Sequence, residues 1–547
     1  MMVAIRKRKK SGKSPHRRDR LSATRATHDL EQLNRIGIAL SETRDVERLL
    51  SLILQKARAI TGADAGSLYL VENGEEAGGK SAAAQLRFKL TQNDSAQFRF
   101  AEHLLRLAED SIAGFCAVHG EAVELADAYR IPKGRPFHFN RTFDEQSGYR
   151  TRSLLALPMK NGKGEVLGVL QLLNCKRKPK ARLSDPAAVR RYVHPFPERA
   201  VRLGMSLASQ AAVAYENSRL YEDIENLFDG FVKAAAKAIE QRDPTTSGHS
   251  QRVCDMTVAL AGAVDHEVRG PYAEMRFSRE QMKELRYAAL LHDFGKVGVR
   301  EEVLVKAKKL YPGQFARLID RFDYIRRDIE ARTEKQKLDA ILTLPRKRAA
   351  EKTRALDAEA KRLLDELDRC QEFVGKANEP TILPTGDFEL LAEIAQKSYM
   401  DPRGLERPYL TSEEVRLLSI PRGSLDDAER TQIEAHVMHS FQFLAQIPWT
   451  PEYHRIPEIA RAHHEKLNGK GYPFGLSAAD IPVQAKMMTV CDIFDALTAS
   501  DRPYKRAVPT DRAIDILKLC AGDGEIDEEL LRLFLEGQVY RIAAKMS

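Results

Sequence analysis

The spacing of apolar residues divides this chain into regions with different predicted structures. From about residue 30 to residue 204, helical spacing as in DVERLLSLILQKARAIT alternates with strand-like runs such as AGSLYLVEN. The runs SLLALPMKN and EVLGVLQLLNC are separated by Asn161, Gly162 and Gly164, and this pattern predicts a β-hairpin. Residues 30–204 are therefore predicted to form a mixed α+β domain.

A stripe of apolar residues follows this domain at alternating steps close to 3.5 residues. Such spacing is typical of the seam of a parallel coiled coil, so we expect a linker helix over residues 205–226 that pairs two copies of the chain as a homodimer. A rigid spacer packed on its own domain is the alternative. The stripe consists of Leu207, Ala211, Ala214, Tyr221, Ile224, Phe228, Phe231 and Ala235.

The composition indicates a multidomain globular protein. The 547 residues are enough for two or three domains, and 43% are apolar while 30% are charged. No apolar run approaches the ~18 residues that a transmembrane segment requires, and the N-terminus lacks the apolar core of a secretory signal. The six cysteines form no CxxC pair, and this scattered pattern is typical of proteins in reducing compartments. We therefore expect a cytoplasmic protein.

The net charge of +9 is concentrated at the N-terminus. Residues 1–20 contain nine Lys or Arg and one acidic residue, Asp19, which leaves the rest of the chain nearly balanced. Overall charge therefore gives no argument for a nucleic-acid partner. Residues 1–29 are predicted to be a basic, disordered tail, with weak contact to anionic lipid or nucleic acid as a minority alternative.

Two pairs of adjacent metal-binding residue types lie at the ends of helical patterns. His292 and Asp293 end the run QMKELRYAALL, and His463 and His464 open the loop segment HHEKLNGKGYPFG. Neighbouring side chains on a helix point about 100° apart, so the members of a pair can each bind one of two nearby metal ions. Three isolated residues would complete such a two-metal site: His249, His436 and Asp492. Taken singly, His249 could instead cap a helix, and His439 rivals His436.

Residues 30–204 resemble a GAF domain, a small ligand-sensing fold. Within FNRTFDEQSGYRTRSLLALP, four residues are similar to the signature of cyclic-nucleotide-binding members: Asn140, Phe143, Asp144 and Glu145. The resemblance implies a small-molecule ligand of unknown identity. In the alternative interpretation, Asp144 and Glu145 cap a loop and pair with Arg150 and Arg152.

The C-terminal half resembles the HD-GYP phosphodiesterases, which hydrolyse cyclic di-GMP within the HD superfamily of metal phosphohydrolases. The motifs RDPTTSGHS, LLHDFGKVGV, HHEKLNGKGYP and DIFDALTASDRPYKRA occur in family order. The resemblance implies an all-α domain over residues 227–547 and Asp293 as the bridge between two metals. The implied metal ligands are His249, His292, Asp293, His436, His463, His464 and Asp492.

The same resemblance implies residues that bind the substrate. Lys296 would hold a phosphate oxygen, and together with Asp293 it would be catalytic. The signature loop is Gly471, Tyr472 and Pro473, and a second phosphate-contacting pair is Arg502 and Lys505. The chain departs from the family twice: Thr245 stands where some members have a Glu for a third metal, which favours two metals, and the spacing between the Asp492 and Arg502 motifs is one residue longer.

The resemblance predicts a two-metal hydrolysis of cyclic di-GMP to linear pGpG, GMP or both. A phosphodiester is anionic, so two divalent metals are needed to neutralise its oxygens and to lower the pKa of a bridging water. Fe or Mn is expected first, with other divalent metals as alternatives. The competing hypotheses are a catalytically weak cyclic di-GMP receptor that acts as a scaffold, and an HD hydrolase of another nucleotide.

Residues 309–421 form an insertion relative to the family. Leu344 and Pro345 separate two helical stripes, which predict a charged antiparallel hairpin followed by an irregular segment up to Pro421. The insertion could cover the site, dock a partner or be a solvated decoration. The stripes are Phe315, Leu318, Phe322, Ile325 and Ile329, and Leu356, Leu363, Leu367 and Cys370.

Overall fold

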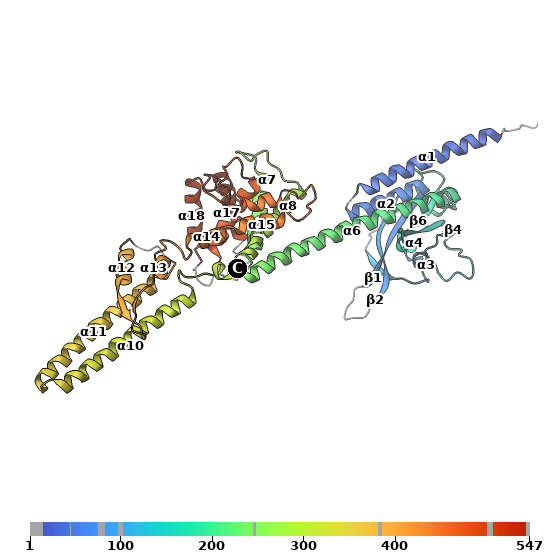
Figure 1. The fold of residues 1–547 in the computed structure, drawn as a ribbon. Coiled ribbons are helices and arrows are strands. Elements are labelled where there is room, and N and C mark those ends of the chain that lie inside the picture. Colours follow the sequence, from blue (N-terminus) through green and yellow to red (C-terminus); the bar gives the residue numbers. More distant parts are fainter. Residues whose placement is uncertain are drawn as a thin grey trace, which may run out of the picture. The chain divides into compact units, whose positions relative to one another are not determined.

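The computed structural model divides the chain into two compact units, Met1–Phe228 and Asp229–Ser547. The residues that it describes are 15–43, 45–74, 82–96, 102–243, 248–380, 385–499 and 507–542. Figure 1 shows the helices and strands of both units. Among the described helices, none combines the length and the apolar composition that crossing a bilayer requires.

The first unit is built on an antiparallel sheet with the order β3-β2-β1-β6-β5-β4, and β7 pairs with β6. The predicted hairpin is β5–β6, and the Asn161 side chain orders its turn by accepting hydrogen bonds from the Lys163 and Glu165 amides at 3.0 Å. The strands are β1 (Ala63–Gly74), β2 (Ala82–Asn93), β3 (His103–Arg106), β4 (Val123–Leu125), β5 (Leu154–Lys160), β6 (Val166–Lys176) and β7 (Val193–His194).

Two apolar cores form around this sheet because strand residues alternate between its faces. On one face, α2 and the first turns of α6 pack through residues such as Leu50, Ile53 and Leu207. On the other face, α3 packs through Phe115 and Cys116. The helices of this unit are α1 (Pro15–Ser41), α2 (Val46–Thr61), α3 (Ile112–His119), α4 (Thr142–Ser147), α5 (Pro186–Tyr192) and α6 (Glu198–Arg242), which continues into the second unit.

Two sequence predictions for this region need correction. Helix α1 begins at Pro15, so the predicted disordered tail does not extend to residue 29; residues 1–14 lie outside the described chain. The first part of the predicted coiled-coil stripe is not a linker seam, because Leu207 and Ala211 are buried in the core of their own unit. Helix α6 exposes the large apolar residues Val213, Leu220, Tyr221, Ile224, Leu227 and Phe231.

The second unit is helical apart from one two-stranded sheet in its described part. Helix α7 packs against α8, α17 and α19, and the short turn η2 packs against α15. The elements outside the insertion are α7 (His249–His266), α8 (Arg279–Leu291), η2 (Phe294–Gly298), α9 (Glu301–Leu304), α14 (Asp427–Glu434), α15 (His436–Leu444), α16 (Ile456–Arg461), α17 (Val483–Thr498), α18 (Thr510–Gly522) and α19 (Glu528–Glu536).

The insertion is the predicted helical hairpin with a core of its own (Figure 1). The segment after the hairpin is more regular than predicted, because two short helices and a small sheet pack onto its base through Leu391, Leu410 and Leu418. The insertion contains α10 (Pro312–Thr343), α11 (Arg346–Ala377), α12 (Thr385–Gln396), β8 (Ser398–Met400), β9 (Glu406–Pro408) and α13 (Ser412–Leu418).

Candidate metal centre

The His292–Asp293 pair sits in a sharp turn that is anchored to α15. Helix α8 ends at Leu291, and Ser440 Oγ accepts a hydrogen bond from the Gly295 amide and donates one to the His292 carbonyl, both at 2.7 Å. A Cβ atom on Gly295 would lie 1.9 Å from the His436 carbonyl oxygen. Only glycine therefore lets this turn approach α15 closely enough for Asp293 to meet His436.

The other histidines are positioned by the ends of α15 and α16. His436 is the first residue of α15, and His463 and His464 directly follow the last turn of α16. Thr489 on α17 donates a hydrogen bond to the His463 carbonyl at 2.8 Å, which ties the histidine pair to the helix that carries Asp492.

The structure brings all seven predicted ligands into one cluster, in which six are buried and His464 is half-buried. Asp293 lies at its centre: His249 Nε2 and His292 Nε2 are 3.6 and 3.5 Å from Oδ2, and His436 Nε2 is 3.2 Å from Oδ1. Asp492 adds contacts of 3.2 Å to His249 Nε2 and 3.9 Å to His464 Nδ1. Three subsets have ligand atoms within 4.8 Å of one another: His436, His463, His464; His249, His292, Asp293; and His292, His463, Asp492.

The orientation of three histidines fits metal coordination. In each, Nδ1 donates to the carbonyl three residues earlier: His292 to Ala289 at 2.7 Å, His436 to Ile433 at 2.6 Å and His463 to Ala460 at 2.5 Å. Their Nε2 atoms are buried and lack a hydrogen-bond partner within the described residues. A buried unpaired nitrogen is costly, and a metal ion would satisfy it. The cluster therefore fits divalent metal ions.

The charge states of His463, His464 and Asp293 agree with this interpretation, because histidine ligands must be neutral and carboxylate ligands ionised. Burial and the neighbouring histidines lower the pKa of His463 well below its usual value, and burial lowers the pKa of His464 to about 4. Burial opposes ionisation of Asp293, but Lys296 and His292 outweigh it and hold the pKa of this carboxyl well below its usual value.

His249 is held from behind by Asp495, a residue that the sequence analysis missed. Asp495 Oδ2 accepts a hydrogen bond from His249 Nδ1 at 2.8 Å, and Arg252 binds the same carboxylate at 2.7 and 3.0 Å. Burial lowers the pKa of His249, but its hydrogen bonds with Asp492 and Asp495 raise it to about 9 in the absence of a cation. The spacing of DIFD was the available signal, since it puts Asp492 and Asp495 one turn apart on α17.

Lys296 joins the metal centre to the end of α6. Its Nζ lies 2.9 Å from Asp293 Oδ2 and 3.3 Å from Asp243 Oδ2. Burial lowers the pKa of Lys296, but the two carboxylates outweigh burial and raise it, so the side chain is a cation at neutral pH. Asp243, the first residue after α6, is buried and was also missed by the sequence analysis.

The GYP loop folds over His464. Tyr472 donates its amide to the His464 carbonyl at 3.2 Å, and the two rings lie 4.8 Å apart. Glu465 holds the far side of the loop, because its carboxylate accepts from the amides of Phe474 and Leu476 at 2.8 Å. A Cβ atom on Gly471 would lie 2.3 Å from the backbone nitrogen of Lys466. Only glycine therefore fits where the loop passes this residue. Pro473 follows Tyr472 at the mouth of this loop and is half-buried.

The remaining predicted residues divide into two groups. Arg502, Lys505 and Thr245 lie outside the described residues. His439, the rival of His436, belongs to none of the three ligand groups found in the described chain and instead packs against Gly298.

In the first unit, Asp144 organises a turn. Its carboxylate accepts hydrogen bonds from the Thr151 amide and hydroxyl at 2.7 and 2.8 Å and from Tyr129 at 3.0 Å. Arg150 lies over the Tyr129 ring at 3.3 Å and 3.6 Å from Asp127, rather than pairing with Asp144 as the alternative supposed. Burial raises the pKa of Asp144 from its usual value.

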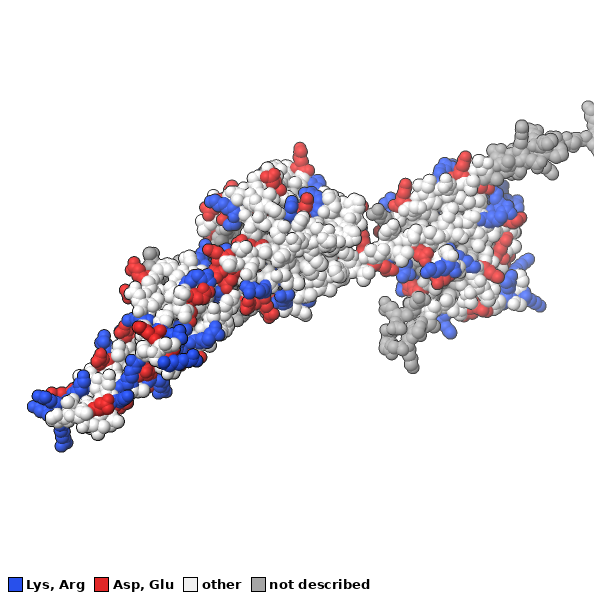
Figure 2. Space-filling view, in the orientation of Figure 1, with Lys and Arg blue, Asp and Glu red and all other residues white. Residues whose placement is uncertain are grey.

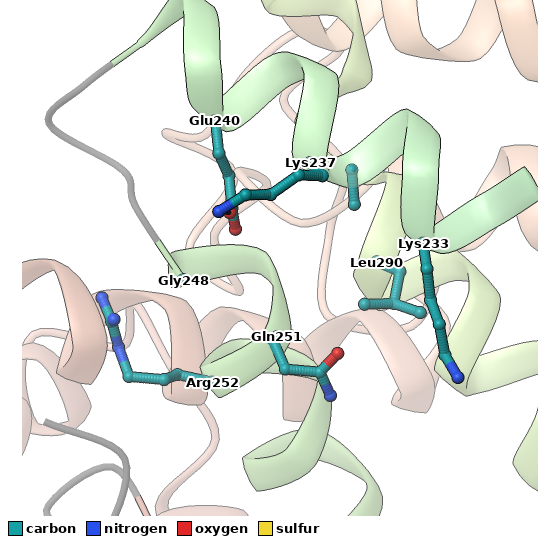
Figure 3. Close-up of a pocket in the computed structure, with 8 residues that line it drawn as sticks. Lys233, Lys237, Glu240, Gly248, Gln251, Arg252 and Leu290 are labelled. Carbon is teal, nitrogen blue, oxygen red and sulfur yellow. Dashed lines mark ion pairs between the residues drawn. The ribbon is translucent and has the colours of Figure 1, made fainter. Parts of the chain in front are cut away.

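A pocket of about 280 Å³ lies between the end of α6 and the start of α7 (Figure 3). Lys233, Lys237 and Glu240 line one side, and Gln251 and Arg252 line the other. Arg252 also binds Asp495, which in turn accepts a hydrogen bond from His249. One wall of this pocket is therefore formed by a residue that helps to hold the partner of His249.

Comparison with known proteins identifies one domain within each unit. A model of the GAF domain matches residues 45–215, and a model of the HD domain matches residues 411–530. The GAF domain of a phosphoenolpyruvate-protein phosphotransferase from Coxiella burnetii is 20% identical with a TM-score of 0.26, covering 36% of this chain and 98% of that one.

Curated relatives include three bacterial phosphodiesterases. A 3′3′-cGAMP-specific phosphodiesterase of Vibrio cholerae is 40% identical over 96 residues, which are 18% of this chain and 20% of that protein. A cyclic di-GMP phosphodiesterase of Pseudomonas aeruginosa is 29% identical over 167 residues, 30% and 36% of the two chains. One of Thermotoga maritima is 35% identical over 130 residues, 23% and 34%.

These matches span only between a fifth and a little over a third of those three relatives. The domain assignment rests on the two domain models together with the relatives. The chain is therefore a multidomain protein in which a GAF domain precedes an HD domain related to phosphodiesterases of cyclic dinucleotides.

Proposed function

We propose that this protein is a metal-dependent phosphodiesterase of the HD-GYP type that hydrolyses cyclic di-GMP to linear pGpG, GMP or both. The observation that carries the proposal is the cluster of three buried, unpartnered Nε2 atoms around Asp293. HD-domain relatives named as cyclic di-GMP phosphodiesterases support the reaction class.

The seven clustered side chains would hold two divalent metal ions, with Asp293 between them and Fe or Mn as the expected metals. Asp293 is suited to bridge because both of its carboxylate oxygens face histidine nitrogens. When bound, two such ions supply Lewis acidity that neutralises the phosphodiester and acidifies a water molecule. The chain itself then has to orient the substrate and stabilise charge that grows in the transition state.

Lys296 is the described residue best placed for this second role. Its ammonium group lies 2.9 Å from Asp293 Oδ2. A protonated amine has no lone pair for a metal ion, so Lys296 can bind a phosphate oxygen without entering the coordination sphere. The Tyr472 ring over His464 would form one wall of the substrate site. Arg502 and Lys505 are proposed from their motif to contact a second phosphate.

A second candidate substrate is 3′3′-cGAMP. The relative from Vibrio cholerae that is named for this dinucleotide is 40% identical over its matched segment. Both dinucleotides present the same phosphodiester to the cluster, so a difference in turnover would come from contacts with the base.

The test is hydrolysis by the purified full chain loaded with Mn²⁺ or Fe²⁺ and given cyclic di-GMP, 3′3′-cGAMP and 3′,5′-cyclic AMP separately. Chromatography should show pGpG or GMP from cyclic di-GMP at the highest kcat/KM. Binding of cyclic di-GMP without product would favour a receptor. Preferred cleavage of another nucleotide would reassign the substrate.

We further propose that the GAF domain binds an unknown small molecule and regulates the HD domain in a cytoplasmic homodimer. Leu220, Ile224 and Leu227 follow heptad spacing on α6, and each is more than half exposed. Pairing of two α6 helices through these residues would bury this stripe.

A further inference from the structure

The hairpin of the insertion ends in an exposed apolar face. We call residues 338–348, with the sequence LDAILTLPRKR, the hairpin apex. Leu338, Ile341 and Leu342 occupy positions i, i+3 and i+4 at the end of α10, so they share one helix face. These side chains are 55%, 59% and 73% exposed, and Leu344 in the turn is 39% exposed.

These apolar side chains do not hold the hairpin together. The buried residues at this end of α10 and α11 are Ala340, Ala349 and Leu356. The turn is fixed by backbone hydrogen bonds, from the Leu344 amide to the Ala340 carbonyl at 3.0 Å and from the Ala349 amide to the Pro345 carbonyl at 2.9 Å. The apex is therefore an ordered structure that presents apolar side chains to its surroundings.

Three cations follow this face directly in the chain. Arg346, Lys347 and Arg348 form the first turn of α11 and are exposed. Cations at a helix N-terminus oppose the helix dipole, so their position does not serve the stability of α11. Across the described chain none of the three has an ion-pair partner, whereas Lys337 pairs with Glu334 and Asp357.

The excess of positive charge extends around the apex. Residues 335–354 contain seven Lys or Arg and two Asp or Glu. Figure 2 shows Lys and Arg side chains, with Asp and Glu among them, at the free end of this hairpin. The apex thus combines protruding aliphatic side chains with a flanking cluster of unpaired cations.

We propose that the hairpin apex docks on the surface of a bilayer that contains anionic phospholipids. The aliphatic side chains would enter the boundary between headgroups and acyl chains, and the three cations would bind lipid phosphates. A nucleic acid would leave the aliphatic side chains in water, and the apex has no aromatic residue for stacking on bases. A second copy of the apex would bring like charges together.

The experiment is flotation of the full chain with vesicles of phosphatidylcholine alone or mixed with phosphatidylglycerol. We expect binding only to the mixed vesicles, with loss at high salt. The double variant Ile341→Ser/Leu342→Ser should bind about tenfold more weakly because it loses apolar contact with the bilayer. The triple variant Arg346→Glu/Lys347→Glu/Arg348→Glu should lose binding through repulsion.

Matched variants keep the result specific to the apex. Leu519→Ser removes a comparably exposed leucine from α18. The triple variant Lys361→Glu/Arg362→Glu/Arg369→Glu reverses three exposed charges in the body of α11. We expect both control variants to bind vesicles within about twofold of wild type. Because the N-terminal tail is also basic, the effect of the Ile341/Leu342 variant should persist when Lys7, Arg8, Lys9 and Lys10 are replaced by alanine.

Equal binding to neutral and mixed vesicles, or wild-type binding by the Ile341/Leu342 variant, would overturn the proposal. If sedimentation shows an oligomer that only the apex variants dissolve, and no vesicle binding, the apex would be assigned to a second copy instead. Helical content and melting temperature identify any variant that fails to fold. Unaltered hydrolysis by these variants would show that the membrane proposal is independent of the active site.

Discussion

Asp495 and His249 are joined by a hydrogen bond of 2.8 Å between Oδ2 and Nδ1, while Asp492 on the same helix lies 3.2 Å from the other ring nitrogen. Helix α17 therefore supports both sides of one imidazole. The ring is oriented before any cation binds, and its Nε2 atom points toward the cluster around Asp293.

We predict that Asp495→Asn weakens metal binding by about 10- to 100-fold, because this change removes the charged partner that orients His249. Calorimetric titration with Mn²⁺ measures the dissociation constant. Activity should recover at saturating Mn²⁺, which separates positioning from unfolding. An unchanged dissociation constant in a folded variant would exclude Asp495 as a positioning residue.

Replacing Asp293 with alanine should abolish turnover and lower the metal content, because contacts to His249, His292, His436 and Lys296 converge on this carboxylate. Elemental analysis and product chromatography give the two readouts. Asp515→Ala removes an exposed carboxylate from α18 and serves as the control. Full turnover by the Asp293 variant would remove this residue from the mechanism.

Gly295→Ala should destabilise the metal-free protein by at least about 2 kcal/mol, because the added methyl group would overlap the His436 carbonyl. Gly262→Ala is a matched control in α7, where a Cβ atom meets no heavy atom within 4 Å. Denaturant unfolding compares the two variants. Equal stability would mean that α15 can move away from the turn without loss.

The metal-free protein should lose stability as the pH falls from about 6.5 to about 4. Burial lowers the pKa of His464 in the folded chain to about 4, whereas the unfolded chain titrates near 6.5, so the unfolded state binds more protons in this interval. Melting temperatures across this range measure the effect. His464→Gln should reduce the slope relative to the wild type, and an unchanged slope would exclude His464 as its source.

Ile224→Lys combined with Leu227→Lys should convert a dimer into monomers, since two charges would face each other across the paired helices. Sedimentation velocity gives the mass, and Leu519→Lys on α18 controls for the loss of an exposed leucine. A wild-type protein that is monomeric at all concentrations would refute pairing through α6.

The sequence predicted well which side chains gather around Asp293, because most of them come from short motifs. His292 with Asp293, and His463 with His464, are adjacent in the chain, and the order of the motifs supplied the single residues. The supporting residues could not be recognised in the same way. Asp243 and Asp495 act through contacts 53 and 246 residues away in sequence, with Lys296 and His249 respectively.

The hairpin of the insertion and the β5–β6 hairpin were also predictable, since each follows from periodicity interrupted by a turn. The stripe on α6 was misleading because helical spacing does not identify the surface that an apolar residue contacts. Leu207 and Ala211 pack on their own sheet, whereas Ile224 and Leu227 on the same helix are exposed. Whether a residue of this stripe is buried or exposed therefore depends on tertiary packing, which the spacing alone does not reveal.

Helix α6 begins with residues in the GAF core, such as Leu207, and ends one residue before Asp243, which binds Lys296. If Lys296 binds a phosphate oxygen as proposed, the Asp243 carboxylate would compete with that phosphate for the ammonium group. The last residue before the described chain is interrupted would then set how freely the lysine can turn toward its substrate.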